Sequence, residues 1–361
     1  MPLVAHSDLP TFARLAQEGE DVLNVERAQH QDIRELHIGL LNMMPDAALA
    51  PTERQFMRLV GSGNRIAQFY VHPFSFDSIE RGEQAAEHIH KYYESFADLQ
   101  EQGLDALIIT GANPKSRDIT RENFWRPLTE VLDWARQNVT SVLCACLATH
   151  ATVKYFHSIE RIPLSSKRWG VFPHRVADRV HPLVRNINTR FDVPHSRWNE
   201  VTRDQLERAG IDTLVEGTSA GVHLAVSADM FRFVYFQGHP EYDRTSLLKE
   251  YKREVLRFLS NDIDDYPPLP VNYFTPAAQP LLERYKERAH QLREPSFLSE
   301  FPEQQLSRLV DNTWGDTGKI MVSNWLGLVY QLTHRVRRIP FMDGINPDDP
   351  LGLRGHRPES S

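Results

Sequence analysis

Residues 141–157, SVLCACLATHATVKYFH, change their secondary-structure pattern within a few positions. The first four residues form a short apolar run typical of a buried strand, whereas residues 148–157 have the apolar spacing of a helix. A strand that leads through a tight turn into a helix is the repeating unit of an α/β fold. The same stretch holds both cysteines of the 361-residue chain, Cys144 and Cys146.

The alternation of strand and helix patterns extends in both directions from this stretch. Further β-rich runs predict strands at residues 36–41, 66–71, 104–110, 212–215, 222–226 and 231–237. Amphipathic segments predict helices at residues 51–60, 85–99, 123–137 and 276–292. This order predicts right-handed βαβ units and a mostly parallel sheet with helices on both faces. In such sheets, ligand sites form at the carboxyl ends of the strands.

The composition excludes several classes of protein. The chain has 41 Lys and Arg against 48 Asp and Glu, a net charge of -7, which argues against binding to nucleic acid or to an anionic membrane. No run of about 18 apolar residues is present, and the first residues do not resemble a secretory signal. Cysteines two positions apart rarely form a disulfide. We therefore expect a cytoplasmic protein.

Cys146 is the first candidate for chemistry. At the turn between strand and helix, a thiol meets the positive end of the helix dipole and unpaired backbone N–H groups, which favour the thiolate. The N–H group of Leu147 could also stabilise an oxyanion. Cys144, still within the strand, lacks these advantages. The alternative is that both cysteines are buried apolar side chains.

Residues 236–243, FQGHPEYD, supply a candidate base. Residues two apart in an extended chain point the same way, so His239 and Glu241 can lie side by side, with Pro240 keeping the backbone extended. Glu241 would then orient the imidazole, and His239 would exchange protons with the thiol. A histidine before proline at a strand end can also be only a local structural feature.

Three further regions carry polar residues, and the first of them follows a predicted strand. In ITGANPKSRD (residues 109–118), Gly111 allows backbone amides to approach a ligand, and this loop, including Ala112, could supply the other half of an oxyanion site. Polar residues also cluster in residues 165–175 (SSKRWGVFPHR) and 193–200 (VPHSRWNE), and we interpret most of them as solvated loop residues or as local hydrogen-bonders. Spacing alone does not select a functional residue among them.

The order of these motifs resembles one enzyme family. TGA, the cysteine at the turn, KRWGVFPH, VPHSR and FQGHPEY resemble the homoserine O-succinyltransferase (homoserine transsuccinylase) family of methionine biosynthesis. HIGLLNMMPD (37–46) and PTERQFMRLVG (51–61) resemble its opening. The resemblance covers roughly residues 1–300 and is specific through the combination of motifs. It implies a flavodoxin-like α/β fold related to the class I glutamine amidotransferases.

The resemblance also implies roles for individual residues. The acyl-thioester cysteine of the family falls on Cys146, its proton-accepting histidine on His239 and its assisting glutamate on Glu241. The substrate-contacting positions fall on Lys167, Ser196 and Arg253.

Lys115 occupies the position that bears on acyl-CoA specificity, where the family has Gly for succinyl or Glu for acetyl. A lysine would attract the free carboxylate of a succinyl group, which favours succinyl-CoA. Leu147 replaces a tryptophan that is usual in the family.

The expected reaction is therefore a ping-pong transfer of succinyl from the co-substrate succinyl-CoA to L-homoserine, with no metal and no bound cofactor. We expect a homodimer with an N-terminal segment (1–34), an acyltransferase domain (35–300) and a C-terminal extension (301–361). Residues 324–338 of the extension predict an amphipathic helix, with Trp325, Leu328, Val329, Leu332 and Val336 on one side, packed on the same chain or on a sister subunit.

Three alternatives stay open. A homoserine O-acetyltransferase or a serine O-acyltransferase would use the same triad. A glutamine amidotransferase subunit would use it to release ammonia, but its nucleophile turn usually reads G-x-C-x-G, and here the flanks are Cys144 and Ala148. The third alternative is a catalytically silent binding or assembly protein.

Overall fold

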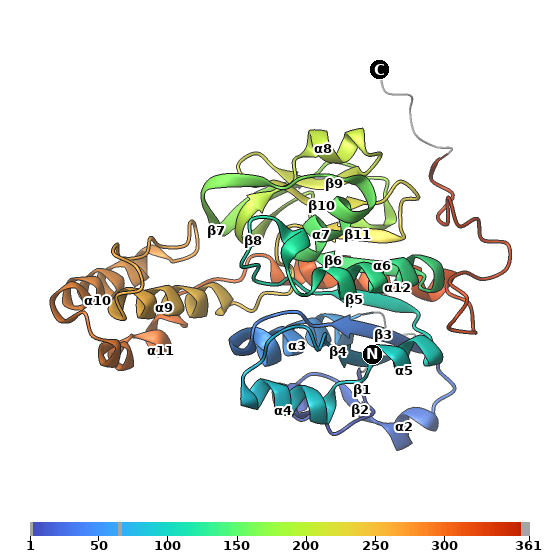
Figure 1. Ribbon diagram of the computed structural model, residues 1–361, viewed down its shortest axis with the longest axis horizontal. Coiled ribbons are helices and arrows are strands. Elements are labelled where there is room, and N and C mark those ends of the chain that lie inside the picture. Colours follow the sequence, from blue (N-terminus) through green and yellow to red (C-terminus); the bar gives the residue numbers. More distant parts are fainter. Residues whose placement is uncertain (1–2, 64–66, 355–361) are drawn as a thin grey trace.

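The computed structural model describes residues 3–63 and 67–354, and these residues build one eleven-stranded sheet (Figure 1). The strands are β1 (Leu3–Ala5), β2 (Val22–Asn24), β3 (Glu35–Leu41), β4 (Gln68–Phe74), β5 (Ala106–Ile109), β6 (Ser141–Ala145), β7 (Ile162–Val176), β8 (Arg190–Glu200), β9 (Asp212–Gly217), β10 (Gly221–Val226) and β11 (Phe233–Phe236). Their order is β2-β1-β4-β3-β5-β6-β11-β10-β9-β7-β8. Neighbours run parallel from β2 to β11 and antiparallel from β11 to β8.

The central strands have the flavodoxin-like order. Counted along the chain from β3, the strands β4-β3-β5-β6-β11 follow the spatial order 2-1-3-4-5. The α/β fold with a mostly parallel sheet is thus confirmed. The order reverses between β3 and β5, and such a reversal opens a crevice at the carboxyl ends of the two strands.

Helices cover both faces of the sheet. They are α1 (Pro10–Gln17), α2 (Val25–Gln29), α3 (Asp46–Gly61), α4 (Glu83–Tyr92), α5 (Phe96–Gln102), α6 (Trp125–Asn138), α7 (Leu147–His157), α8 (Arg203–Arg208), α9 (Ser246–Leu259), α10 (Gln279–Leu292), α11 (Glu303–Leu306) and α12 (Gly315–Leu332). Successive strand residues enter different cores: Ile108 packs with residues of α1, α3 and α12, and Ile109 with residues of α5, α6 and α7. This two-residue alternation places one core on each face.

The helices α9, α10 and α11 form a lobe with its own apolar core, beside the sheet (Figure 1). The connector at residues 266–274 reaches this lobe and pairs with β7 through an isolated bridge between Gly170 and Val271. The connector therefore links the lobe to β7 of the sheet.

Helix α12 packs on its own chain. Trp325 is 1% exposed, belongs to the same core as α3, and donates from Nε1 to Ser141 Oγ of β6 at 2.8 Å. The predicted helix at residues 324–338 is displaced toward the C-terminus, because α12 already begins at Gly315 and ends at Leu332, and Val336 beyond it is 51% exposed. The division of the chain at residues 34 and 300 stays a prediction.

The interpretation of residues 165–175 and 193–200 as solvated loops is wrong, whereas the alternative of local hydrogen bonding is confirmed for His174 and Arg197, which donate to the carbonyls of Phe172 and Asn199. These residues lie in β7 and β8, which form a long antiparallel hairpin, and His174, His195 and Arg197 are buried. Polar side chains, prolines and a glycine interrupt the apolar alternation there, so the strand pattern is hidden. The short strands β1 and β2 were likewise not predicted.

Two further predictions are corrected. The single helix at residues 85–99 is two helices, α4 and α5. Between them, Tyr93 turns inward to donate from its hydroxyl to Glu53, and Ser95 caps the start of α5. The strand at residues 66–71 is β4, which continues to Phe74, while its expected first residue, Ile66, lies outside the described residues. In the described residues, no helix has the length and apolar character needed to cross a bilayer.

Candidate active site

Cys146 and His239 follow two neighbouring parallel strands. Cys146 comes directly after β6, and His239 comes three residues after β11, which pairs with β6 so that Ala145 lies opposite Phe236. The N–H of Cys146 donates to the carbonyl of Phe236 at 2.7 Å. Both residues therefore lie at the carboxyl edge of the sheet, as predicted.

Cys146 has a strained backbone at the start of α7. Its φ is 51° and its ψ is -110°, a conformation that non-glycine residues rarely adopt, and α7 begins at the next residue. Such a turn exposes a nucleophile above the sheet and next to the helix N-terminus. The turn forms between Cys144 and Ala148, so glycines at these flanking positions are not needed for it.

The two cysteines have different surroundings. Cys144 is fully buried against Thr152, and burial raises the pKa of its thiol to about 12. Cys146 is partly exposed. Cys144 is therefore the buried apolar residue of the pair, and Cys146 is the one that solvent and ligands can reach.

His239 and Glu241 form a buried pair. Nδ1 of His239 lies 2.7 Å from Oε1 of Glu241, and since a carboxylate only accepts, Nδ1 donates and Nε2 is left to exchange a proton. Nε2 has no conventional hydrogen-bond partner among the described residues. Burial lowers the pKa of His239, but the charge of Glu241, followed by that of Cys146, raises this pKa well above its ordinary value. The imidazole is thus coupled electrostatically to both a carboxylate and the Cys146 sulfur.

The segment that carries His239 is fixed from both sides. The N–H of His239 donates to the Pro194 carbonyl of β8 at 2.9 Å, and the ring of Tyr242 stacks on the imidazole with centroids 4.2 Å apart. Gly238 is required at the bend, because a Cβ there would lie 2.5 Å from Val193 and 2.8 Å from His223. The imidazole therefore has little freedom to move.

A cavity of about 940 Å³ opens at Cys146. Its wall brings together all the remaining residues that the sequence indicated for the site: Ala112, Lys115, Leu147, Lys167, Ser196 and Arg253. His239 and Glu241 are not part of this wall and are 8% and 7% exposed. The cavity therefore reaches Cys146 directly, and His239 lies outside its wall but interacts electrostatically with Cys146.

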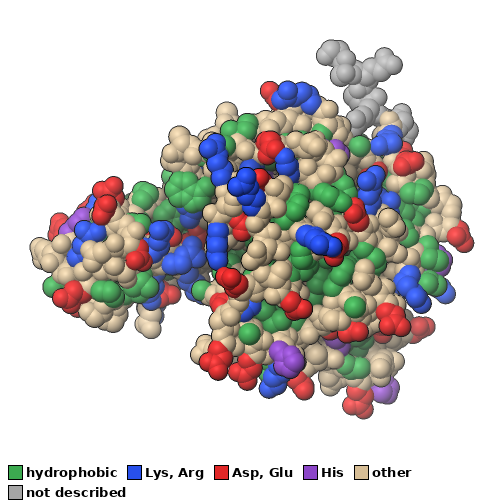
Figure 2. Space-filling model, viewed as in Figure 1, with side chains coloured by type: hydrophobic (Ala, Val, Ile, Leu, Met, Phe, Trp, Pro, Cys, Tyr) green, Lys and Arg blue, Asp and Glu red, His purple; other side chains and the backbone are tan. Residues whose placement is uncertain are grey.

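The wall of this cavity is strongly basic. Besides Lys115, Lys167 and Arg253 it contains Arg117, Arg161, Arg197 and Arg257, together with Glu254. Figure 2 shows Lys and Arg side chains gathered where the lobe of α9 to α11 meets the rest of the molecule. Although the whole chain is acidic, this cavity is suited to an anionic ligand.

Two of these arginines also fix the wall. Arg197, which is 2% exposed at its side chain, donates to Asn199 and Ala220 carbonyls, and Arg161 donates to the carbonyls of Ser116 and Arg117. Both interact electrostatically with Cys146. Neither arginine has a distinctive spacing in the sequence, so neither was predicted as a functional residue.

Glu250 of α9 organises the substrate-contacting positions and was also missed. Its carboxylate accepts from Ser196 Oγ at 2.6 Å, from Trp169 Nε1 at 2.9 Å and from the hydroxyl of Tyr242 at 2.5 Å, and it pairs with Lys167 Nζ at 3.4 Å. Burial would raise the pKa of Glu250, but Lys167, Ser196 and Tyr242 hold it below its ordinary value. Its position one helical turn before Arg253 is the only sequence signal that pointed toward this role.

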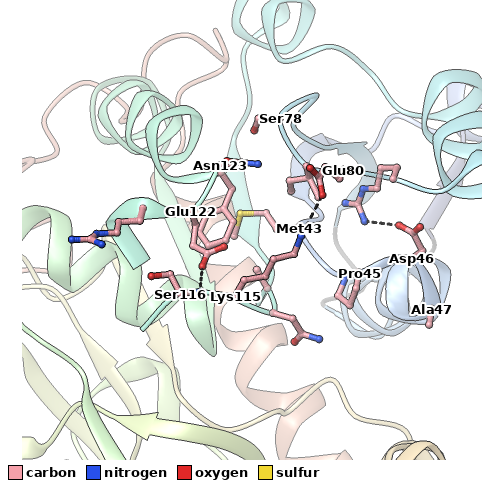
Figure 3. A pocket seen from close by; sticks show the side chains of 16 residues that line it. Met43, Pro45, Asp46, Ala47, Ser78, Glu80, Lys115, Ser116, Glu122 and Asn123 are labelled. Atoms are coloured by element: carbon pink, nitrogen blue, oxygen red, sulfur yellow. Dashed lines mark hydrogen bonds and ion pairs between the residues drawn. The ribbon is translucent and has the colours of Figure 1, made fainter. Parts of the chain in front are cut away.

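A second cavity of about 800 Å³ lies at the crevice between β3 and β5 (Figure 3). The segment after β3, which includes Met43 and Pro45, contributes to the wall of this cavity. Residues between β5 and α6, which include Asn123, also contribute to it. Lys115 lines both cavities, and its Nζ lies 3.2 Å from Oε2 of Glu80, with both side chains largely exposed. Lys115 is therefore near the site but already has an acidic partner.

The chain is similar to several known proteins. A family model described as homoserine O-succinyltransferase matches residues 2–335. The chain is 58% identical over 354 residues to the homoserine O-succinyltransferase of Methylobacter tundripaludum and 59% identical over 354 residues to that of Methylococcus capsulatus, covering 98% of this chain and 100% of each relative. A solved glutamine amidotransferase from Methylobacillus flagellatus is similar at 11% identity, with a TM-score of 0.45 over 82% of this chain and 95% of that chain. The chain belongs to the homoserine O-succinyltransferase family.

Proposed function

We propose that this chain transfers a succinyl group from succinyl-CoA to the hydroxyl of L-homoserine through a thioester on Cys146. The observation that carries the proposal is the position of the Cys146 sulfur, at a strained turn, beside the His239–Glu241 pair and at a basic cavity. Membership of the homoserine O-succinyltransferase family supports the choice of substrates.

In the first half-reaction, the thiolate of Cys146 attacks the thioester carbonyl of succinyl-CoA. The bond between the carbonyl carbon and the CoA sulfur breaks, and the departing CoA thiolate takes the proton of His239. The oxyanion would accept from the N–H of Leu147, at the first residue of α7, and from the N–H of Ala112. Gly111 next to Ala112 lies beside Cys146, since a Cβ on Gly111 would be 3.6 Å from the Cβ of Cys146.

In the second half-reaction, the homoserine hydroxyl gives its proton to Nε2 of His239 and attacks the succinyl carbonyl. The bond to Cys146 breaks, and its sulfur leaves as the thiolate. Glu241 stabilises the imidazolium that forms, through the hydrogen bond between Oε1 and Nδ1. The reaction uses no metal and no bound cofactor, and succinyl-CoA is a co-substrate.

The binding residues differ in mobility. Lys167 and Ser196 are fixed by Glu250, which suits them to a substrate that needs a defined position. Arg253 is 47% exposed at its side chain and its guanidinium suits the homoserine carboxylate. The arginines around the cavity suit the phosphates of CoA. The proposal includes a homodimer in the cytoplasm, on the basis of the family resemblance.

Intact mass measurement tests the proposed intermediate. The purified chain is incubated with succinyl-CoA or with acetyl-CoA, without an acceptor. We expect a mass increase of one succinyl group, retained in a Cys144→Ala variant and lost in Cys146→Ala. An adduct with acetyl-CoA alone would support the acetyl-transferring alternative, and no adduct with either donor would contradict the proposal. Rates with homoserine and with serine then identify the acceptor.

Lys115→Glu should change the preference between acyl donors. Reversing a charge near the succinyl carboxylate, in a solvated position, is worth about 1–2 kcal/mol, so we expect kcat/KM for succinyl-CoA to fall roughly tenfold relative to acetyl-CoA. Glu80, which pairs with Lys115 in the native chain, would add to the repulsion. Lys115→Gln should lie between the two. An unchanged ratio in both variants would show that Lys115 does not face the acyl group.

A further inference from the structure

A group of histidines and a glutamate lies on the sheet away from Cys146. His6 follows β1, His72 lies in β4, and Glu94 lies between α4 and α5. Strands β3 and β5 separate β4 from β6, so this group is distinct from the candidate active site. One ligand atom from each of the three residues lies within 4.8 Å of the other two.

The hydrogen bonds of His6 direct a lone pair toward Glu94. Nδ1 of His6 is 3.1 Å from the carbonyl of Val4, and because a carbonyl only accepts, Nδ1 carries the hydrogen. In the neutral ring Nε2 then carries the lone pair, and it lies 4.0 Å from Oε1 of Glu94. A cation placed between these two acceptors would interact with both.

The second histidine can present a lone pair without losing a proton. Nδ1 of His72 lies 2.6 Å from Oε1 of Glu94, Nε2 of His72 lies 2.9 Å from Nδ1 of His37, and Nε2 of His37 lies 3.5 Å from Glu35. If the hydrogens of His72 and His37 both move from Nδ1 to Nε2, each ring keeps one hydrogen. Nδ1 of His72 is then free to bind a cation, while Nε2 donates to His37 and His37 donates toward Glu35. Such outer partners are typical of metal-binding histidines.

We propose that His6 Nε2, His72 Nδ1 and the Glu94 carboxylate bind a divalent transition-metal ion, with zinc as the best match, and that water fills the fourth position. Two imidazoles and one carboxylate are a zinc-type set, whereas magnesium and calcium prefer oxygen alone. Tetrahedral ligands at about 2.1 Å from zinc lie roughly 3.4 Å apart. The 2.6 Å and 4.0 Å separations in this group bracket that value, so small side-chain movements suffice.

The ion would fix the segment that follows β1 to strand β4 of the sheet. β1 has three residues and pairs with β4 only between Leu3 and Phe69. His6, one residue beyond β1, would be fixed through the metal to His72 of β4 and to Glu94. The role is therefore structural, and it is independent of the proposed acyl transfer.

Metal binding to the full-length chain tests the inference. The chain is stripped with a chelator and titrated with Zn²⁺ by calorimetry and with Co²⁺ by absorption, in wild type and in Cys146→Ala, so that the active-site thiol does not contribute. We expect one equivalent, the visible bands of four-coordinate cobalt, and a rise in melting temperature. Glu94→Gln and His6→Asn should each abolish all three effects. His37→Asn, which changes only the outer partner, should weaken binding about 10–100-fold.

His88→Gln is the matched control, since His88 also pairs with a buried carboxylate, that of Glu53 at 3.1 Å, but lies outside the group. It should bind like wild type. Glu94→Gln preserves shape at a side chain that is 30% exposed, and circular dichroism checks that it folds. Less than one equivalent bound by wild type, or equal affinity in wild type, Glu94→Gln and His6→Asn, would overturn the inference.

Discussion

Cys146→Ala is expected to lower the rate of succinyl transfer by roughly 10⁴-fold or more, because Cys146 is the only thiol among the described residues that line the cavity. The backbone of α7 should be retained, since alanine is smaller than cysteine at a partly exposed position. The measurement is the steady-state rate with succinyl-CoA and homoserine, together with the mass of the enzyme after incubation with the donor alone.

Cys144→Ala is the control for this substitution. Cys144 differs from Cys146 by two positions but is fully buried, with a thiol pKa raised by burial, so its loss should leave turnover close to wild type. If Cys146→Ala kept full activity, the covalent route would be wrong, and a direct transfer or a silent binding protein would have to be considered.

Glu241→Gln is expected to lower kcat by roughly 10²–10⁴-fold and to change its pH dependence. In the acyl-enzyme, the sulfur has no charge, and His239 must be neutral to accept the homoserine proton. Glu241 is then the group that raises the pKa of His239 against the effect of burial. Without its charge this pKa falls, so the acidic limb of kcat moves to lower pH although the maximum rate is smaller.

Glu241→Asp separates charge from geometry. Aspartate keeps the carboxylate but is shorter, so the rate should fall while the acidic limb stays nearer to that of wild type. The pH dependence of kcat at saturating donor and acceptor distinguishes the variants. An acidic limb at the same pH in wild type and Glu241→Gln would mean that the limb belongs to another group.

The central part of the fold could be predicted because its strand residues are buried on both faces of the sheet. Residues 106–109 and 142–144 are apolar throughout, and a strand buried on both faces between helices permits little else. The hairpin of β7 and β8 could not be predicted in this way. Its residues contact a polar cavity, a glutamate of α9 and solvent, so buried polar and exposed positions alternate without a clean apolar period.

In the candidate site, too, some residues could be predicted from the sequence and others could not. Cys146, His239 and Glu241 lie in short segments at strand ends, where local spacing is enough to suggest a role. Glu250 acts through side chains of β7 and β8 and through Tyr242, and these contacts depend on how the lobe meets the sheet. The spacing of residues along one helix contains no such information.

The contacts of Glu250 have a consequence for evolution. The Glu250 carboxylate accepts from or pairs with four donors, on Lys167, Trp169, Ser196 and Tyr242. A substitution at any one of these five positions therefore leaves a poorly solvated charge or a donor without an acceptor. A substitution at only one of these positions is therefore disfavoured. These five residues are expected to be inherited as a set, and descendants that change the acceptor substrate should replace several of them at once.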